Sequence, residues 1–446
     1  MKKFYIKTYG CQMNEYDAEY ISSIFYNMGF CETGTIVEAD YIVINTCSVR
    51  EKPQSKVYSE LGRLSLLVNK KPDLKIGICG CVAQQDGLDI FKKFETVKFI
   101  VGTDALSNLS TILENVEAGI RVIDIEFTGK DFIFTNYNKR KKRTAYVGIM
   151  KGCDNFCSYC IVPVVRGRER SRPLKEIIDE VKKLIDYGTK EITFLGQNVN
   201  SYGKSLDENI NFPKFLNIVS RINGLERIRF TTSHPKDLTE ELIYECASNK
   251  KICKHVHMPL QSGSDRILHL MNRGYSVSEY MAKLEKLRKI IPDIGVTSDF
   301  IVGFPTESDE DFNSTLKVLS DVQYNTIFAF KYSKRPLTKA FELSDNIGSF
   351  VKKERLDKVL KVQAEITYNV NRIYEGKMVE VLVEGISKRD NKVYTGRNSQ
   401  NIVVNFTSRD HIGVGDIVNV KIAEGKKNSL FGDRVLNKFI GGENVS

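Results

Sequence analysis

The sequence predicts an α/β protein with three parts: an N-terminal doubly wound parallel α/β domain, a central partial (β/α)6 barrel and a small C-terminal all-β barrel. Strand-like runs alternate with helical runs through roughly the first hundred residues, and again, six times, in the middle of the chain. From Tyr374 the apolar pattern changes to period two. Because 446 residues exceed one typical core, we expect domains at residues 2–118, 139–370 and 373–441.

Each of the three N-terminal strand-like runs leads into a cysteine. The runs are Phe4–Tyr9, Tyr41–Asn45 and Lys75–Cys79, and the cysteines are Cys11, Cys47 and Cys81. Asn14 is the expected N-cap of the helix that follows the first cysteine. Parallel strands joined by helices gather ligands at their carboxyl ends, so these cysteines, 36 and 34 residues apart, should converge on one rim. The pattern predicts a metal site; the alternative is three ordinary buried cysteines.

The six central strand-like runs are too few to close an eight-stranded barrel, so a partial barrel is predicted. They are Ala145–Met150, Glu191–Leu195, Arg227–Thr232, His255–Pro259, Val296–Val302 and Thr326–Phe330. A charged amphipathic helix from Lys352 to about Arg372 follows them. The C-terminal runs with period two predict a small closed module. They are Met378–Val383, Val393–Gly396, Ile402–Phe406 and Ile417–Ile422.

Cys153, Cys157 and Cys160 form a CxxxCxxC motif directly after the first central strand. Three thiolates on one loop are one short of a four-cysteine zinc site. They can hold a [4Fe–4S] cluster in which one iron has no protein ligand and stays open to a substrate. Zinc with a distant fourth ligand is the alternative.

The composition argues against a membrane protein and a disulfide-linked scaffold. The sequence has no run of about eighteen apolar residues, and we expect no signal peptide. We therefore expect a soluble cytoplasmic protein without membrane contact. In that reducing compartment its ten cysteines favour catalysis or metal binding.

Most of the net charge of +10 lies around the CxxxCxxC motif. Between Thr135 and Lys175, eleven lysines and arginines face only Asp154 and Glu169, a balance of +9. Such a run is often only a solvated surface, but beside a catalytic loop it favours a polyanionic substrate, above all nucleic acid. Our candidate RNA-binding residues are Lys139, Arg140, Lys141, Lys142, Arg143, Arg166, Arg168 and Arg170.

The motif, with Tyr159 before its last cysteine, resembles the radical S-adenosylmethionine superfamily. The resemblance implies that the open iron chelates S-adenosylmethionine and that the reduced cluster cleaves it to a 5′-deoxyadenosyl radical. An electron donor such as flavodoxin or ferredoxin would then be a partner. Tyr159, Gln197 and Asn198 are candidate contacts for S-adenosylmethionine, the last two from their position at a strand end.

The segments around the N-terminal cysteines, Gly10–Asn14, Asn45–Arg50 and Gly80–Gln84, resemble the N-terminal domain of methylthiotransferases. In that family the matching cysteines hold a second [4Fe–4S] cluster whose open iron carries the transferred sulfur. A sulfur-supplying protein would be a further partner. The other cysteines match no motif and are expected in cores. They are Cys31, Cys79, Cys246 and Cys253.

Further matches extend the resemblance over essentially the whole chain and indicate the MiaB type of methylthiotransferase. They are Phe194–Asn200, Thr232–Pro235, His257–Ser264, Asp299–Glu307 and Tyr332–Pro336. This type methylthiolates C2 of N6-isopentenyl (dimethylallyl) adenosine at position 37 of tRNA, beside the anticodon. The C-terminal module resembles a TRAM domain, an RNA-binding β-barrel, although its own charge is nearly balanced.

Several alternatives stay open at this point. Related methylthiotransferases modify threonylcarbamoyl adenosine or a ribosomal protein, and the motifs Gln197–Asn200 and Gly396–Asn401 favour the isopentenyl substrate over both. An iron–sulfur electron carrier or an RNA-binding scaffold is the alternative of another class. His234, His255 and His257 lie near strand ends, and we interpret them as core residues without a catalytic role. We expect a monomer.

Overall fold

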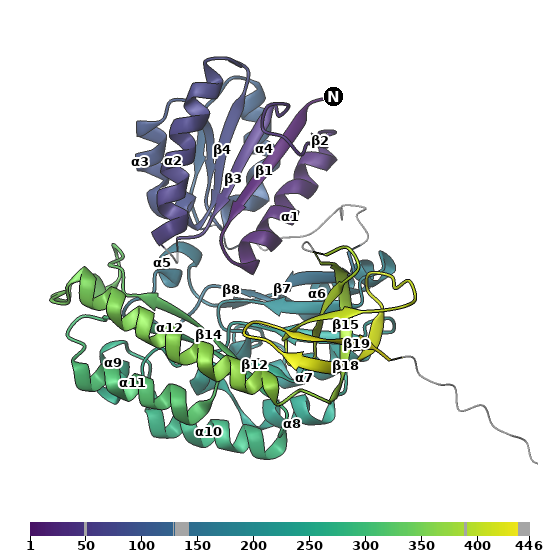
Figure 1. Cartoon of the computed structure of the whole chain (residues 1–446). Helices are drawn as coiled ribbons and strands as arrows, with labels where there is room; N and C mark the ends of the chain where they lie inside the picture. The colour runs from purple at the N-terminus through teal and green to yellow at the C-terminus, as the bar shows by residue number, and fades with distance from the viewer. Residues whose placement is uncertain (49–50, 128, 130–141, 388–389, 436–446) are drawn as a thin grey trace, which may run out of the picture.

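The computed structural model describes residues 1–48, 51–127, 129, 142–387 and 390–435. Figure 1 shows an N-terminal α/β domain above a central domain, with a C-terminal barrel packed beside it. The predicted fold class is therefore confirmed in all three parts. Within the described ranges, no helix is long and apolar enough to cross a bilayer.

The N-terminal domain is built on a fully parallel six-stranded sheet in the order β2-β1-β3-β4-β5-β6. The strands are β1 (Lys3–Tyr9), β2 (Cys31–Glu32), β3 (Tyr41–Thr46), β4 (Lys75–Gly80), β5 (Val97–Val101) and β6 (Val122–Asp124). Apolar side chains of α1 and α4 cover one face, and those of α2 and α3 cover the other. The helices are α1 (Gln12–Asn27), α2 (Glu51–Val68), α3 (Cys81–Lys93), α4 (Leu109–Glu117) and the short η1 (Ala105–Asn108).

The start of α1 differs from the prediction. The N-cap is Cys11, and Asn14 is the third residue of the helix, so the predicted N-cap was wrong. The Asn14 side chain instead accepts a hydrogen bond from the Cys11 backbone N–H at 3.3 Å, which satisfies the helix start from inside. Its amide also donates to Asn45 at the end of β3, at 3.3 Å. Asn14 thereby ties two cysteine-bearing strand ends together.

Six parallel strands form the central partial barrel. They are β7 (Thr144–Gly148), β10 (Glu191–Leu195), β11 (Arg227–Phe230), β12 (His255–His257), β13 (Gly295–Val302) and β14 (Thr326–Lys331). They pair as β7-β10-β11 and β12-β13-β14, and a parallel bridge from Ile228 to Ile252 joins the two halves. Each strand falls on a predicted run, so the partial barrel is confirmed.

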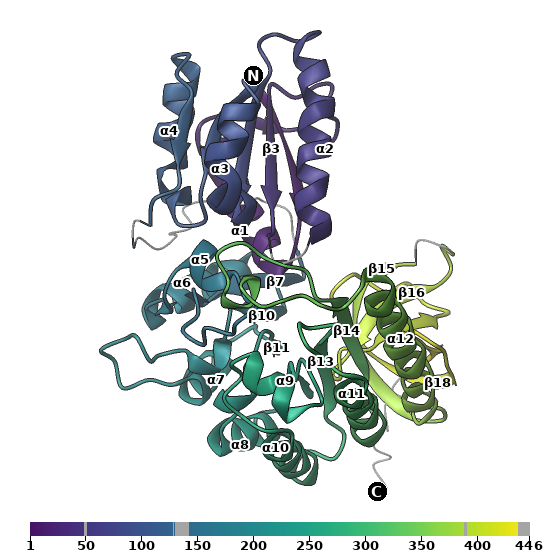
Figure 2. The ribbon, with the colours of Figure 1, turned by 90° about the vertical axis from the view of Figure 1, so that its left-hand side faces the viewer.

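Most central helices lie outside these strands, α5 lies against α3 of the N-terminal domain, and α12 lies against the last strand and the C-terminal barrel (Figure 2). They are α5 (Val162–Arg166), α6 (Leu174–Asp186), α7 (Phe212–Ser220), α8 (Glu240–Ser248), α9 (Asp265–Leu270), α10 (Val277–Ile290), α11 (Asp309–Val322) and α12 (Ser349–Arg372), with η2 (Val199–Ser201), η3 (Pro235–Asp237) and η4 (Lys339–Phe341). A small antiparallel pair, β8 (Met150–Lys151) and β9 (Arg170–Ser171), closes the base of the cysteine loop.

The C-terminal module is a closed barrel in the order β15-β16-β17-β19-β18. Its strands are β15 (Met378–Ile386), β16 (Tyr394–Asn398), β17 (Val403–Thr407), β18 (Ile417–Gly425) and β19 (Leu430–Arg434). The sequence pattern predicted four of them. It missed β19 because this short run interrupts its apolar residues with glycine, aspartate and arginine.

The turn between β16 and β17 enters the base of the central barrel. Arg229 on β11 donates to the Asn398 carbonyl at 2.8 Å and to the Ser399 carbonyl at 3.2 Å. The same guanidinium forms an ion pair with Glu191 at 3.0 Å, and both side chains are buried. The C-terminal barrel is therefore held by buried charge as well as by packing.

Replacing Arg229 with methionine should loosen this junction. Breaking a buried ion pair by removing one partner costs about 3–5 kcal/mol, because Glu191 would be left charged and unpaired. We expect the midpoint of the first unfolding transition of the metal-free chain to move to a lower urea concentration. Arg409→Met, at an exposed site, is the control. Equal midpoints for the two variants would contradict the prediction.

Candidate active site

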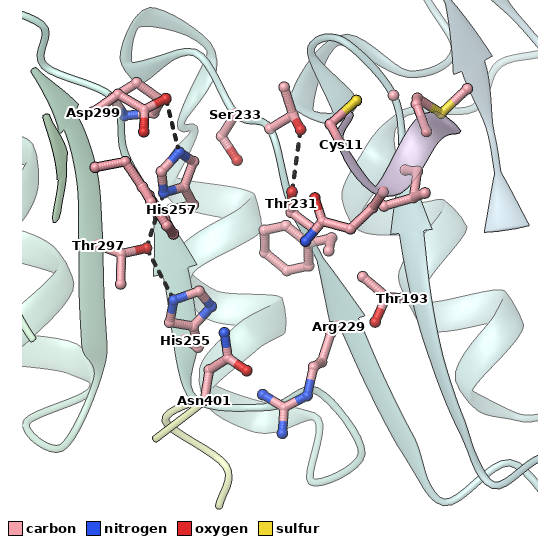
Figure 3. Close-up of a pocket in the computed structure, with 18 of the residues that line it drawn as sticks. Cys11, Thr193, Arg229, Thr231, Ser233, His255, His257, Thr297, Asp299 and Asn401 are labelled. Atoms are coloured by element: carbon pink, nitrogen blue, oxygen red, sulfur yellow. Dashed lines mark hydrogen bonds and ion pairs between the residues drawn. The ribbon is translucent and has the colours of Figure 1, made fainter. Parts of the chain in front are cut away.

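One cavity of about 1020 Å³ is lined by residues of all three domains. Figure 3 shows Cys11 and Asn401 approaching the same space from the N-terminal and C-terminal domains, with His255 and His257 on the central strands between them. The cavity wall contains six cysteines: Cys11, Cys47, Cys81, Cys153, Cys157 and Cys160. The two predicted cysteine triads thus face one space.

The N-terminal triad sits where three parallel strands end. Cys11 follows β1, Cys47 follows β3, and Cys81 is the first residue of α3 after β4. The Cys47 thiol lies within hydrogen-bonding reach of both other cysteines. Gly80, with φ +91°, makes this approach possible, because a Cβ there would lie 2.6 Å from the Thr46 carbonyl oxygen.

Two of these thiols have thiolate character near neutral pH. The hydrogen bond from Cys47 lowers the pKa of Cys11 to about 6, and the positive charge of Arg166 lowers it further. The same influences lower the pKa of Cys81 to about 7. The pKa of Cys47 is correspondingly raised, because its proton is shared with two partners. Thiolates are the form that binds metals.

The Cys153–Cys160 loop is fixed at several points. Arg273, itself buried, donates to the Cys157 sulfur at 3.2 Å. The Ser158 backbone N–H donates to the Met271 carbonyl at 2.9 Å. The Ser158 carbonyl accepts from the Ala340 backbone N–H at 2.7 Å. Burial raises the pKa of Cys153, and it raises the pKa of Cys160 to about 12. A cluster bound here would have to displace protons from these thiols.

The donor sets fit clusters with an open iron. Each triad offers three thiols, and none of the other cysteines lines the cavity. Among the described residues, no three His, Cys, Asp or Glu side chains converge to hold a single ion, whereas a cluster binds each thiolate through a different iron. Cys79, Cys246 and Cys253 are buried, as predicted, but Cys31 is half-exposed on the edge strand β2, so its assignment to a core was wrong.

Only two of the three candidate contacts for S-adenosylmethionine lie on the cavity wall. Tyr159 and Gln197 line the cavity, although the Gln197 side-chain oxygen already accepts from the Gly152 N–H at 2.6 Å. Asn198 is 1% exposed and is absent from the cavity wall. Its amide donates to Asp237 at 2.7 Å and accepts from the His234 backbone at 3.0 Å. The assignment of Asn198 was therefore wrong, because its hydrogen bonds hold two loops together.

Sequence reasoning missed a set of polar side chains on the cavity wall. They are Thr193, Thr231, Ser233, Thr297, Asp299 and Asn401. The strand residues among them alternate inward along predicted strands, which is a signal that could have identified them. Asn401 ends the motif Gly396–Asn401, but strand periodicity does not place it at the cavity, because only the docked C-terminal barrel brings it there.

The histidines His234, His255 and His257 also line this wall. Thr297 Oγ1 lies 3.0 Å from His255 Nε2 and 2.9 Å from His257 Nδ1. Burial lowers the pKa of His234 to about 2 and the pKa of His255 to about 3. These two weakly basic rings are poorly suited to proton abstraction at neutral pH.

The predicted RNA-binding cations have varied environments. Lys139, Arg140 and Lys141 lie outside the described residues. Lys142 pairs with Glu19, Arg143 donates to the Gly188 carbonyl, Arg168 is exposed and pairs with Asp154, and Arg170 pairs with Asp104.

Arg166 is 4% exposed and pairs with Asp17, so its assignment as a surface contact for RNA was wrong. Lys151 and Arg172, which also contribute to the +9 run, are buried as well. Most of the described cations in this run are therefore neutralised by carboxylates within the fold.

The lowered pKa of Cys11 predicts an alkylation profile. In the metal-free chain, iodoacetamide should modify Cys11 at a rate that is half-maximal near pH 6 and level above pH 7, because only the thiolate reacts. Peptide mass spectrometry across pH 5–9 measures this rate. Cys47→Ala removes the hydrogen bond and should move the profile toward that of a free cysteine, near about 8.5. A native rate that keeps rising through pH 8 would contradict the prediction.

Comparisons with known proteins agree with this architecture. Residues 147–319 match the radical SAM superfamily, residues 3–102 match the uncharacterized protein family UPF0004, and residues 372–435 match the TRAM domain. A protein of Thermodesulfovibrio yellowstonii is 47% identical over 433 residues, covering 96% of this chain and 98% of its own. One of Acetivibrio thermocellus is 45% identical over 439 residues, covering 97% and 91%. Both are named tRNA-2-methylthio-N(6)-dimethylallyladenosine synthase.

Solved structures share the fold at low sequence identity. The radical S-adenosylmethionine methyltransferase TsrM from Kitasatospora setae, solved with cobalamin and a [4Fe–4S] cluster, has a TM-score of 0.58 at 13% identity. The match covers 76% of this chain and 77% of that one. The cobalamin-dependent radical enzyme OxsB has a TM-score of 0.51 at 12% identity, covering 83% and 58%. At this identity the likeness concerns the fold alone.

Proposed function

The chain belongs to the family of tRNA-2-methylthio-N(6)-dimethylallyladenosine synthases, and from this membership we infer that it methylthiolates C2 of N6-dimethylallyladenosine in tRNA. It is a radical enzyme that uses S-adenosylmethionine and [4Fe–4S] clusters. Relatives with this substrate name extend over nearly the whole chain, which favours the isopentenyl substrate over threonylcarbamoyl adenosine and over a ribosomal protein. They also favour an enzyme over an electron carrier or a scaffold.

One observation carries the proposal: both cysteine triads line a single cavity. In our proposal, Cys153, Cys157 and Cys160 hold the cluster that chelates S-adenosylmethionine. Cys11, Cys47 and Cys81 hold the second, sulfur-carrying cluster. Pockets for one drug-sized ligand span about 300–1,000 Å³. The cavity of about 1020 Å³ lies at the upper end of this range and is lined by both thiol triads.

When bound, the clusters and S-adenosylmethionine supply the methyl group, the sulfur and the radical that removes hydrogen from C2. The protein positions these groups and shields them from solvent. The ends of β1, β3 and β4 hold one triad and the Cys153–Cys160 loop holds the other, and both line the cavity. A site lined by three domains limits reaction of the radical with solvent. The polar wall residues Thr231, Ser233 and Asp299 are available to hydrogen-bond the cofactor or the adenine edge.

The function is tested in cells. The gene should be expressed in a bacterial strain that lacks its own methylthiotransferase and accumulates N6-isopentenyladenosine in tRNA. Nucleoside mass spectrometry should then detect the 2-methylthio derivative. Conversion of threonylcarbamoyl adenosine instead, or no change in any tRNA nucleoside, would refute the proposed substrate.

Partners follow from the same proposal. The C-terminal barrel and the exposed cation Arg168 are suited to the anticodon stem-loop, because phosphate contacts need accessible positive charge. An electron donor such as flavodoxin or ferredoxin, and a sulfur-supplying protein, would serve the two clusters. We further propose that the protein is cytoplasmic and monomeric, with domains at residues 2–118, 139–370 and 373–441.

A further inference from the structure

A buried ion pair stands directly beside the N-terminal cysteines. Arg166, the last residue of α5, donates from Nη2 to Asp17 Oδ2 at 2.8 Å. Asp17 is 1% exposed and lies on α1, six residues after Cys11. The pair therefore connects the segment that follows one cysteine triad to the helix that begins at the other.

The second nitrogen of this guanidinium has no protein partner. Arg166 Nη1 and Asp17 Oδ1 are both buried, and neither has a hydrogen-bond partner among the described residues. An unsatisfied buried donor costs about 1–3 kcal/mol, and more when it is charged. Arg166 also lines the cavity together with Cys11, Cys47 and Cys81. The unused donor thus belongs to a side chain that borders the cavity beside three thiols, where a group bound on those thiols is a candidate acceptor.

Packing fixes α5, the helix that carries this guanidinium. Val165 on α5 and the N-cap residue Ile161 pack against Cys81, and the Thr103 hydroxyl donates to the Val165 carbonyl. Figure 1 shows α5 at the junction of the N-terminal and central domains. Despite burial, Cys81, Asp17 and Cys11 raise the pKa of Arg166 above its ordinary value. The cation is thus permanent and is held beside the thiols.

We propose that Arg166 is a positioning residue for the sulfur-carrying cluster: Asp17 orients its guanidinium, which balances the thiolate charge and donates its free Nη1–H to a sulfur atom bound at the triad. This inference rests on the proposed function, because it requires a cluster on Cys11, Cys47 and Cys81. Reduction adds negative charge to such a cluster, so a fixed cation beside it stabilises the reduced form and raises its midpoint potential.

The test isolates this cluster in the full-length chain. Cys153→Ala, Cys157→Ala and Cys160→Ala together leave only the N-terminal triad able to bind iron. In this background, Arg166→Gln keeps a hydrogen-bonding side chain but removes the charge, and Arg166→Lys restores the charge. The control is Arg172→Gln, because Arg172 is also buried, pairs with Glu180 at 2.8 Å and links the domains through Tyr16 at 2.9 Å, but lies off the cavity wall.

Redox titration followed by electron paramagnetic resonance gives the midpoint potential of each variant. We expect Arg166→Gln to shift the ratio of reduced to oxidised cluster about tenfold toward the oxidised form, which is about 59 mV for one electron. Arg166→Lys should recover most of the shift, and Arg172→Gln should show none. Loss of iron in Arg166→Gln alone, restored by lysine, would equally support the inference.

Two results separate the inference from the function on which it rests. If the parent triple variant binds a cluster whose potential does not change when Arg166→Gln is added, the role of Arg166 is refuted and the cluster stands. The same conclusion holds if Arg172→Gln shifts the potential as much as Arg166→Gln does. If the parent binds no iron, the N-terminal cluster is refuted and the role of Arg166 falls with it.

Discussion

Replacing Cys157 with alanine is expected to abolish cleavage of S-adenosylmethionine. Loss of a group that merely supports a metal ligand costs about 10–100-fold, so loss of a ligand should lower 5′-deoxyadenosine formation by more than about 100-fold. The variant also removes the sulfur that Arg273 contacts at 3.2 Å, although Tyr159 and Tyr275 still accept hydrogen bonds from this guanidinium. The measurement is anaerobic reconstitution with iron, sulfide and reductant, followed by chromatography of the products.

A matched control is available in the same domain. Cys253 is buried and does not line the cavity, so Cys253→Ala removes a thiol of this domain without touching either triad. It should retain 5′-deoxyadenosine formation. Substantial product from Cys157→Ala, or equal loss in both variants, would show that the loop does not hold the radical-generating cluster.

Replacing Cys47 should abolish methylthiolation without abolishing cleavage of S-adenosylmethionine. This thiol contacts both other members of the N-terminal triad, so Cys47→Ala should remove one cluster and about half of the bound iron. Because the Cys153 loop is fixed by its own contacts, 5′-deoxyadenosine formation should persist. Methylthiolated nucleoside should fall by more than about 100-fold, by the same reasoning about a lost ligand.

Cys79 provides the control for this second experiment. It lies on β4, two residues before Cys81, and is fully buried in the sheet and away from the cavity. Cys79→Ala should keep both iron content and methylthiolation. Methylthiolation that survives in Cys47→Ala would place the sulfur source elsewhere, and loss of 5′-deoxyadenosine in that variant would show that the two sites are not independent.

Local pattern was enough to predict most of the strands and the two cysteine triads. Strand periodicity and the cysteine after each strand depend on neighbouring residues alone, and the rule that parallel strands end at a common edge does the rest. The N-cap of α1 was misplaced because Asn14 serves from within the helix, bonded back to Cys11. No capping preference distinguishes these two uses of an asparagine.

The environments of the charged residues around the CxxxCxxC motif could not be predicted from local sequence. The basic run looked like one surface, but Arg166 and Arg172 are buried in ion pairs with residues of other segments, Asp17 and Glu180. Those carboxylates are distant or unremarkable in sequence, so nothing local signals that they neutralise the run. The same holds for Asn401, which reaches the cavity only through the docking of a separate domain.

Because Asn401 lines the cavity, the cavity wall is incomplete until the C-terminal barrel has folded. Its turn lies late in the chain, and the strands and cysteines that form the rest of the wall precede it. During translation, the central barrel can therefore fold while its base is still open to the surroundings, and the wall is complete only after β17 and β19 have left the ribosome. The last part of the cavity wall is thus added by a module that contributes no cysteine to it.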